Sequence, residues 1–215
     1  SSLEIPETIE KVRGSAFSGC TGIKELTMPV DLDYVKTNLS FSTSVDGYSS
    51  FKNCENIEKI TYSKGKTGIM PDLEDNFVGD NTSNYTAEYY AGKNLTTVEF
   101  EEGVKNIGAR AYYVYKDPAD SKYKYGMPKL KNVKLATTVK KIGDYAFCGD
   151  KAITEFDFTN IEELGEVSFY GCNGLSDLKI PAGLKEIPVY CFCGCTGLSS
   201  LEIPETIEKV RGSAF

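Results

Sequence analysis

The chain has 215 residues, a net charge of -7 from 31 acidic and 24 basic side chains, and no histidine. The acidic balance argues against a nucleic-acid backbone or an anionic membrane surface as the main partner. No apolar run approaches the roughly 18 residues that span a bilayer, so membrane insertion is not expected. The lack of histidine removes Ser-His and Cys-His nucleophile pairs and imidazole metal ligands.

The chain repeats a unit whose clearest copy is Leu175–Gly197, LSDLKIPAGLKEIPVYCFCGCTG. Its frame is an apolar residue, two variable residues, an apolar residue, one variable residue and an apolar residue, often followed by proline. Two apolar positions three apart come next, then a small residue, an aromatic residue and, three residues later, a cysteine. A period in the low twenties indicates a solenoid, in which each unit contacts only its neighbours. In chain order the units are 1–22, 23–56, 57–94, 95–129, 130–152, 153–174, 175–197 and 198–215.

Three consecutive units, together covering 23–129, are lengthened by insertions, whereas 1–22 and 130–215 keep the short form. The unit 23–56 has its extra residues between Val35 and Gly47. The unit 57–94 contains DLEDNFVGDNTSNYT before its aromatic residue, Tyr89. In the unit 95–129 the insertion YVYKDPADSKYKYGMPK follows the aromatic position. We expect a single domain over 1–215, itself a fragment of a longer array.

The opening segment of each unit alternates apolar and polar residues, which is typical of a half-buried strand, and the Gly and Pro that follow end it. With one strand in each unit, equivalent strands must lie parallel in one sheet. The second segment, such as VKKIGDYAF at 139–147, has room for one further short strand or a single helical turn. The pattern therefore predicts a mostly β solenoid with brief helical turns.

The frame LxxLxIPxxLxxIxxxAFxxC resembles the BspA-like leucine-rich repeats of bacterial surfaces and some parasitic protists. The general leucine-rich signature places Asn or Cys soon after the strand, whereas here the Cys comes at the far end of the unit, as in the BspA-like type. The resemblance implies an α/β fold by leucine-rich-repeat convention, wound as a right-handed solenoid. It also implies extracellular or cell-surface display and adhesion to host proteins or cells, with no catalytic residues.

Residues 1–17, SSLEIPETIEKVRGSAF, are identical to residues 199–215. Seventeen matches are not a chance result, because neighbouring units share only their frame. Either the block belongs to a longer tandem array, or one end was duplicated or grafted. Both ends fall inside a unit without the polar cap that a solenoid normally needs. We expect flanking sequence in the natural protein, and end-to-end self-association through the uncapped units.

Four of the seven cysteines share one position of the frame, three residues after a phenylalanine: Cys20, Cys54, Cys172 and Cys195. Stacked units would bring neighbouring members within about 5 Å, at which a disulfide is geometrically conceivable. The simpler interpretation is a column of buried thiols that act as small hydrophobes. The run Cys191-x-Cys193-x-Cys195 could suggest a metal, but Cys191 aligns with Ala16 and Ala146, a packed position. We therefore expect neither a metal nor a cofactor.

The solvent-facing positions of the predicted sheet are the first candidate binding surface, and acidic residues predominate there. A face with one sign of charge could steer a basic protein ligand. The alternative is that polar outer residues only keep the sheet soluble. The acidic candidates are Glu99, Glu101, Glu155, Asp157 and Asp177.

The insertions are the second candidate, because loops on a rigid scaffold commonly carry binding and here should form one contiguous patch. Eleven of the fourteen tyrosines lie between Tyr34 and Tyr125, and tyrosine offers a large contact area at low entropic cost. The alternative is that these rings pack on each other to hold the loops down. The tyrosine candidates are Tyr85, Tyr89, Tyr90, Tyr113, Tyr115, Tyr123 and Tyr125.

No nucleophile elbow, phosphate-binding Gly-Lys loop or dinucleotide motif is present, and no carboxylate pair is singled out, so we expect no enzyme. The acidic run from Asp72 to Asp80 does not match a Ca²⁺-binding loop. The sequence predicts a cell-surface or secreted module that binds a host or extracellular protein, or a glycan, through the tyrosine-rich loops and the acidic face. The alternative is a structural spacer without a ligand of its own.

Overall fold

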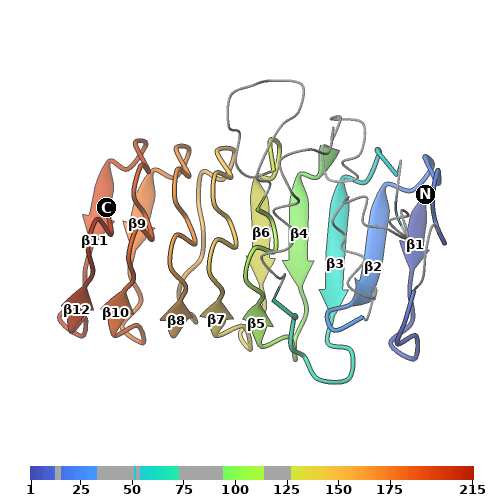
Figure 1. Cartoon of the computed structure of the whole chain (residues 1–215), viewed down its shortest axis with the longest axis horizontal. Coiled ribbons are helices and arrows are strands. Elements are labelled where there is room, and N and C mark those ends of the chain that lie inside the picture. The colour runs from blue at the N-terminus through green and yellow to red at the C-terminus, as the bar shows by residue number, and fades with distance from the viewer. Residues whose placement is uncertain (13–15, 33–50, 52–53, 73–93, 114–126) are drawn as a thin grey trace, which may run out of the picture.

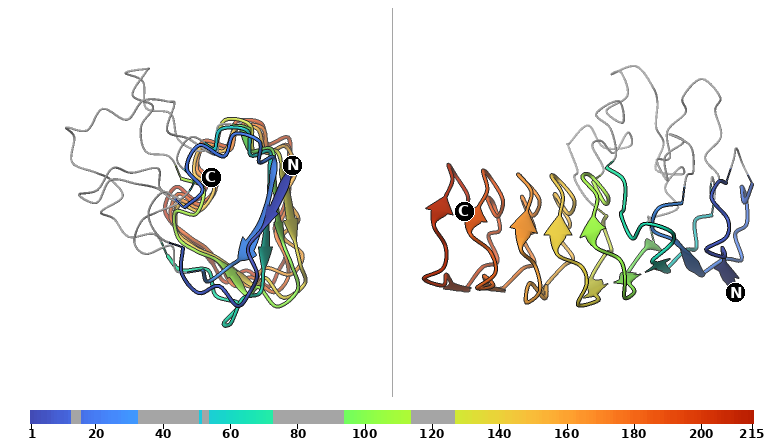
Figure 2. Two further views of the ribbon diagram at one scale, coloured as in Figure 1. Left: turned by 90° about the vertical axis from the view of Figure 1, so that its right-hand side faces the viewer. Right: turned by 90° about the horizontal axis from the view of Figure 1, so that it is seen from below.

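The computed structural model describes residues 1–12, 16–32, 51, 54–72, 94–113 and 127–215. The units lie side by side in a row along the longest axis, with the N-terminus at one end and the C-terminus at the other (Figure 1). Viewed along the row, the described units follow one another as similar turns of chain, and the first strands of the units share one side (Figure 2).

The first strands of the units pair in parallel, as predicted. The register aligns equivalent residues across the units, so that Leu3, Leu26 and Ile60 are successive partners. One five-stranded sheet has the order β1 (Ser2–Glu4), β2 (Glu25–Pro29), β3 (Lys59–Ser63), β4 (Thr97–Phe100) and β6 (Asn132–Leu135). Near the C-terminus, β9 (Asp177–Lys179) pairs with β11 (Ser200–Glu202).

The expectation of one strand in each unit and one continuous sheet is wrong, whereas the further short strand for which the second segment had room is present. Several units have a second strand of two residues, and no strand is assigned at 155–157, which separates β6 from β9. There the Asp157 carboxylate accepts a hydrogen bond from the Thr159 N–H at 2.9 Å and turns the chain. The second strands are β5 (Asn106–Ile107), β7 (Lys141–Ile142), β8 (Glu163–Leu164), β10 (Glu186–Ile187) and β12 (Lys209–Val210).

The described residues contain almost no helix, and hydrogen-bonded turns stand where short helical turns are expected. In the unit 130–152 the Cys148 N–H bonds the Tyr145 carbonyl oxygen at 3.2 Å. Tyr145 and Gly149 both have positive φ, 57° and 81°, and left-handed residues on either side prevent a right-handed helix from extending. Within the described ranges, no helix has the length and apolar character that a membrane crossing requires.

A column of stacked aromatic rings runs through the interior. Phe147 and Phe169 stack with their ring centroids 5.3 Å apart, and Phe169 continues onto Phe192 at 5.6 Å. Phe156 and Phe158 meet Phe169 edge-on. Ring pairs in these geometries add to the stabilisation that burial of their area provides. The aromatic position of the frame therefore joins the core of each unit to that of the next.

Candidate functional site

The outer face of the five-stranded sheet carries charges of both signs. The Glu99 carboxylate on β4 lies 2.6 Å from the Lys59 ammonium on β3 and 3.9 Å from the Lys134 ammonium on β6. The hydrogen bond from Lys59, together with the charges of both lysines, lowers the pKa of Glu99. Its negative charge is therefore compensated within the sheet and is only partly available to a basic ligand.

The other acidic candidates do not converge on one point. Asp157 is held by Thr159, whose hydrogen bonds lower the pKa of the carboxyl group. The Asp177 carboxylate on β9 accepts a hydrogen bond from the Ser176 hydroxyl at 2.9 Å. Glu101 and Glu155 are exposed. The structure thus places these side chains on solvated surface without gathering them into a site.

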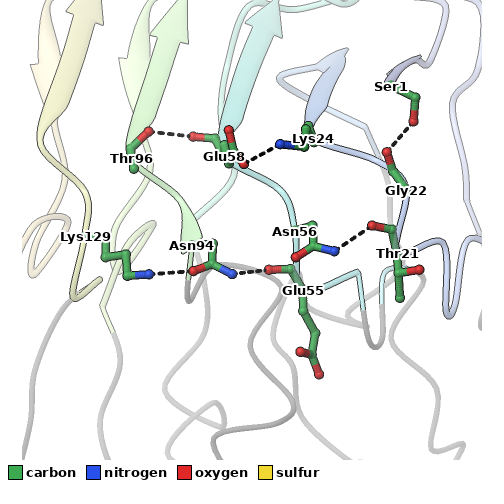
Figure 3. A network of polar contacts seen from close by, with 10 residues as sticks. All are labelled: Ser1, Thr21, Gly22, Lys24, Glu55, Asn56, Glu58, Asn94, Thr96 and Lys129. Carbon is green, nitrogen blue, oxygen red and sulfur yellow. Dashed lines mark hydrogen bonds and ion pairs between the residues drawn. The ribbon is translucent and has the colours of Figure 1, made fainter.

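A ladder of polar side chains joins the first units where the chain returns to a new unit (Figure 3). The Asn56 amide donates to the Thr21 carbonyl oxygen, and the Asn94 amide donates to the Glu55 carbonyl oxygen, each at 2.8 Å. The Asn94 side-chain oxygen in turn accepts a hydrogen bond from the Lys129 ammonium at 2.7 Å. Asn94 directly follows residues 73–93, and Lys129 lies shortly after residues 114–126. The hydrogen bond between Lys129 and Asn94 therefore joins the described chain just after these two segments.

Most of the predicted tyrosine candidates lie outside the described residues: Tyr85, Tyr89, Tyr90, Tyr115, Tyr123 and Tyr125. Tyr113 is described and is half-buried. Its ring centroid is 5.6 Å from that of Tyr145, in a tilted arrangement. The structure therefore connects Tyr113 to a tyrosine of a regular unit, which the sequence pattern did not single out.

Five residues at the same position of successive units have left-handed backbone, which is uncommon for residues other than glycine. The position is the third residue after the apolar residue of the second strand. In each case the residue directly precedes the small residue of the small–aromatic pair. The five are Arg110 (φ 60°), Tyr145 (57°), Val167 (60°), Tyr190 (54°) and Ser213 (51°).

A ladder of backbone hydrogen bonds between units holds this conformation. The Tyr145 N–H donates to the Glu166 carbonyl oxygen at 3.0 Å, and the Val167 N–H donates to the Val189 carbonyl oxygen at 3.0 Å. Such strain costs of order 1–3 kcal/mol per residue and persists only where the surrounding structure imposes it. The repeated ladder of backbone hydrogen bonds imposes the left-handed conformation on these residues. Strained residues of this kind cluster at ligand sites.

Residues at the left-handed position, together with tyrosines three residues after it, form a surface that we call the aromatic edge. It consists of Arg110, Tyr113, Tyr145, Tyr170 and Tyr190. The Arg110 guanidinium lies over the Tyr145 ring, 5.3 Å from its centroid. Tyr170 and Tyr190 are 37% and 46% exposed. The turn from Val167 to Tyr170, closed by a 3.1 Å hydrogen bond, brings Tyr170 to the same edge.

Sequence analysis missed Tyr145, Tyr170 and Tyr190 because they lie in the regular units. The available signal is positional: Tyr145 and Tyr190 each occupy the third place after the isoleucine of the second strand, where other units have Arg110 or Val167. A large side chain at the left-handed position is the feature that identifies the edge.

The cysteine column is confirmed for three of its four predicted members, since Cys54, Cys172 and Cys195 are buried free thiols. The Cys172 thiol donates to the Phe147 carbonyl oxygen of the preceding unit, and the Cys195 thiol donates to that of Phe169, each at 3.1 Å. Burial raises the pKa of Cys195 to about 11. Cys20 is exposed instead. The three buried thiols, whose pKa values burial raises, are neutral and belong to the core.

Asp150 takes the cysteine position in the unit 130–152 and is fully buried. One carboxyl oxygen accepts a hydrogen bond from the Met127 N–H, while the other has no hydrogen-bond partner among the described residues. Burial raises the pKa of Asp150 well above its usual range. Asp150 is therefore protonated over a wider pH range than an exposed aspartate.

The described part of the chain groups no three His, Cys, Asp or Glu side chains as metal ligands. Of the acidic run considered for Ca²⁺, only Asp72 is described. Its carboxylate accepts a hydrogen bond from the Ala109 N–H at 2.7 Å. Asp72 thus has a structural role where the described chain gives way to 73–93.

Comparison with known structures finds leucine-rich-repeat proteins. A leucine-rich repeat protein from Bacteroides ovatus ATCC 8483 is 18% identical with a TM-score of 0.44. The alignment covers 97% of this chain and 56% of the Bacteroides chain. The Treponema pallidum protein TpLRR is 12% identical with a TM-score of 0.40, covering 97% and 86%. The pneumococcal vaccine antigen PcpA is 17% identical with a TM-score of 0.42, covering 100% and 75%. The chain spans little more than half of the Bacteroides protein.

No curated protein matches the chain. The family model for the BspA type leucine-rich repeat region matches six copies over residues 1–116 and 120–215. That match covers nearly the whole sequence and agrees with the parallel strand register and the frame of the repeat. The chain belongs to the BspA-type leucine-rich-repeat family.

Proposed function

We propose that this chain is a non-enzymatic, surface-displayed repeat module, wound as a right-handed solenoid, that binds an extracellular macromolecule through the aromatic edge. The observation that carries the proposal is the row of side chains on left-handed backbone, in which Tyr145 is half-buried beneath Arg110 and Tyr190 is exposed. Host or extracellular protein is the expected partner, and glycan is the second class. The tyrosine-rich segments 73–93 and 114–126 are predicted to add to the same surface.

The dimensions of the edge suit a macromolecular ligand. Equivalent residues of adjacent units are about 4.8 Å apart, the spacing of paired strands, so four steps from Arg110 to Ser213 span about 20 Å. Tyrosine presents a rigid amphipathic ring with few rotatable bonds, and an arginine beside it adds a hydrogen-bonding cation. An extended strip with these groups fits a polypeptide or an oligosaccharide chain.

The alternative is a spacer that holds other domains away from the cell. A spacer needs stacking between units, which the aromatic column supplies. It has no need for a large aromatic side chain at a strained, exposed position such as that of Tyr190, where Ser213 shows that a small residue is compatible with the fold. The aromatic edge therefore favours binding.

The test compares three forms of the full chain on an array of extracellular-matrix proteins, mucins and glycans. The edge variant combines Tyr145→Ser, Tyr170→Ser and Tyr190→Ser. Serine already occupies the left-handed position of Tyr145 and Tyr190 in the last unit. The control changes the sheet face through Glu25→Gln on β2 and Asp177→Asn on β9. Circular dichroism confirms that all three are folded.

Binding that the sheet-face variant keeps and the edge variant loses supports the proposal. Binding lost only by the sheet-face variant moves recognition to the sheet and overturns it. An array without any bound molecule leaves the spacer as the better account.

A further inference from the structure

The aromatic edge consists of two rows of residues that the same turn joins in four successive units. The first row is the left-handed position, and the second row is the residue three places later. In each unit the N–H of the second-row residue donates to the carbonyl oxygen of the first-row residue, at 3.1 to 3.3 Å. The four pairs are Arg110 with Tyr113, Tyr145 with Cys148, Val167 with Tyr170, and Tyr190 with Cys193.

The tyrosines of the regular units are staggered between these rows. In the first row Val167 separates Tyr145 from Tyr190, and in the second row Tyr170 lies between Cys148 and Cys193. A tyrosine in one row therefore accompanies a smaller residue in the other. At about 4.8 Å for each unit, the interval between Tyr145 and Tyr190 is about 9.6 Å. The edge thus repeats its large side chains every second unit.

Main-chain groups along the edge are already used between units. The Tyr145 and Val167 N–H groups donate to carbonyl oxygens of the following unit, each at 3.0 Å. The Tyr170 carbonyl oxygen accepts a hydrogen bond from the Gly149 N–H of the preceding unit at 2.7 Å. A peptide that adds to a sheet needs unpaired main-chain groups on its receptor. Side chains must therefore recognise a ligand at this edge.

The interval of the tyrosines matches one turn of a polyproline II helix. That helix has three residues per turn and a rise of about 3.1 Å, so every third side chain returns to the same side after about 9.3 Å. It has no internal hydrogen bonds, and its carbonyl oxygens can accept bonds from tyrosine hydroxyls. Aromatic side chains are the usual partners of proline-rich segments. Val167 is smaller than its two neighbours in the row and leaves room for a proline ring between them.

Charge favours a basic ligand over an anionic glycan. Asp144 and Glu166 directly precede the first-row residues of their units, and both are exposed. The Asp144 carboxylate accepts a hydrogen bond from the Glu166 N–H at 2.9 Å, which holds it at the edge. Of the cations near the edge, Arg110 lies over a tyrosine ring and Arg211 forms its ion pair with Glu186. The two carboxylates therefore attract lysine or arginine and repel a sialylated or sulfated sugar.

We propose that the ligand of the aromatic edge is a basic, proline-rich polypeptide segment in the polyproline II conformation. This inference rests on the proposed function and names the class of its partner. The segment lies along the row of units, with one proline on Val167 between Tyr145 and Tyr190. Tyr170 lies alongside the next turn of the segment, and a lysine or arginine of the ligand meets Asp144 and Glu166.

The test measures binding of two labelled peptides to the full chain by fluorescence anisotropy. The first peptide has about 12 residues, enough for about four turns, with proline at every third position and two arginines. The second has alanine in place of each proline and the same charge. Because alanine does not hold the polyproline II conformation, we expect the proline peptide to bind at least tenfold more tightly.

Two single substitutions test the assigned contacts, with circular dichroism to confirm folding. Val167→Arg fills the space between the two rings and repels the ligand, so we expect at least tenfold weaker binding; Arg110 shows that the position accepts arginine. Glu166→Gln should weaken binding several-fold at low salt and less at high salt. The matched control is Glu162→Gln in the same unit, where Glu162 pairs with Lys140; it should leave the affinity unchanged.

The inference is wrong if the two peptides bind equally, if Val167→Arg binds like the unaltered chain, or if Glu166→Gln and Glu162→Gln have the same effect. A proline peptide that does not bind also overturns it. If the edge variant nevertheless loses a ligand found on the array, the proposed function stands and only the class of partner is wrong. Proline-peptide binding that the edge variant retains in full overturns both.

Discussion

Replacing Asp150 by asparagine removes the ionisable group from the cysteine column while keeping its shape. The amide oxygen still accepts the hydrogen bond from the Met127 N–H, and an NH₂ group replaces the carboxyl oxygen that has no partner among the described residues. We expect Asp150→Asn to be more stable than the unaltered chain at neutral pH and to differ little near pH 4.

The direction follows from proton linkage. The folded-state pKa of Asp150 lies well above its usual range because of burial, and the unfolded value is about 3.9. Between the two values the folded state holds the proton and the unfolded state does not, so stability falls as the pH rises. The loss is about 1.4 kcal/mol for each pH unit until the folded-state pKa is reached. Below about pH 4 the loss disappears.

The assay is urea denaturation at a series of pH values, and the quantity compared is the difference in unfolding free energy between the two chains. Carboxylates whose pKa is lowered, such as Glu99 and Glu186, give the opposite slope at acid pH, but they occur in both chains and cancel. Cys148 and Cys172 nearby remain neutral thiols, because burial raises their pKa values. A difference that is flat from pH 4 to pH 8 refutes the reasoning.

Three further predictions concern packing, thiols and charge. Phe169→Ala removes a buried ring from the stacked column and should lower the unfolding free energy by about 3–5 kcal/mol. Tyr170→Ala, at the neighbouring exposed residue, should change the unfolding free energy by no more than about 0.5 kcal/mol. Equal losses for the two variants in thermal or urea denaturation contradict the burial of Phe169 and the exposure of Tyr170. A thiol reagent should modify Cys20 and Cys193 in the folded protein, and the five buried cysteines only after denaturation; early labelling of the buried thiols, measured by mass, rules out the column. Glu99→Gln should cost at most about 1 kcal/mol at low salt, and less in high salt; an undiminished loss in high salt argues against the ion pairs with the two lysines.

The parallel first strands, the stacked aromatic residues and three of the buried cysteines could be predicted because a repeat places equivalent residues side by side. The frame alone thus predicts that Leu26 lies between Leu3 and Ile60. The second segments were compatible with either a short strand or a helical turn, since two residues are too few to show a periodicity. The break near Asp157 depends on one side chain that turns the chain at Thr159.

The candidate binding surfaces were harder to predict. The tyrosines are concentrated in the lengthened units, whereas Tyr145 and Tyr190 occur singly in regular units and have no unusual composition around them. Their importance depends on a left-handed backbone that the structure reveals through φ, with no Gly or Asn at the position to signal it. The sheet face is also less negatively charged than the number of its acidic residues suggests, because Glu99 forms ion pairs with two lysines.

The most direct test of the central claim is the affinity of the edge variant for a ligand found on the array. Isothermal titration compares it with the unaltered chain and with the sheet-face variant. The account predicts at least a tenfold weaker Kd for the edge variant, equivalent to about 1.4 kcal/mol or more, and an unchanged Kd for the sheet-face variant. An unchanged Kd for the edge variant would contradict the claim that this protein binds its partner through the aromatic edge.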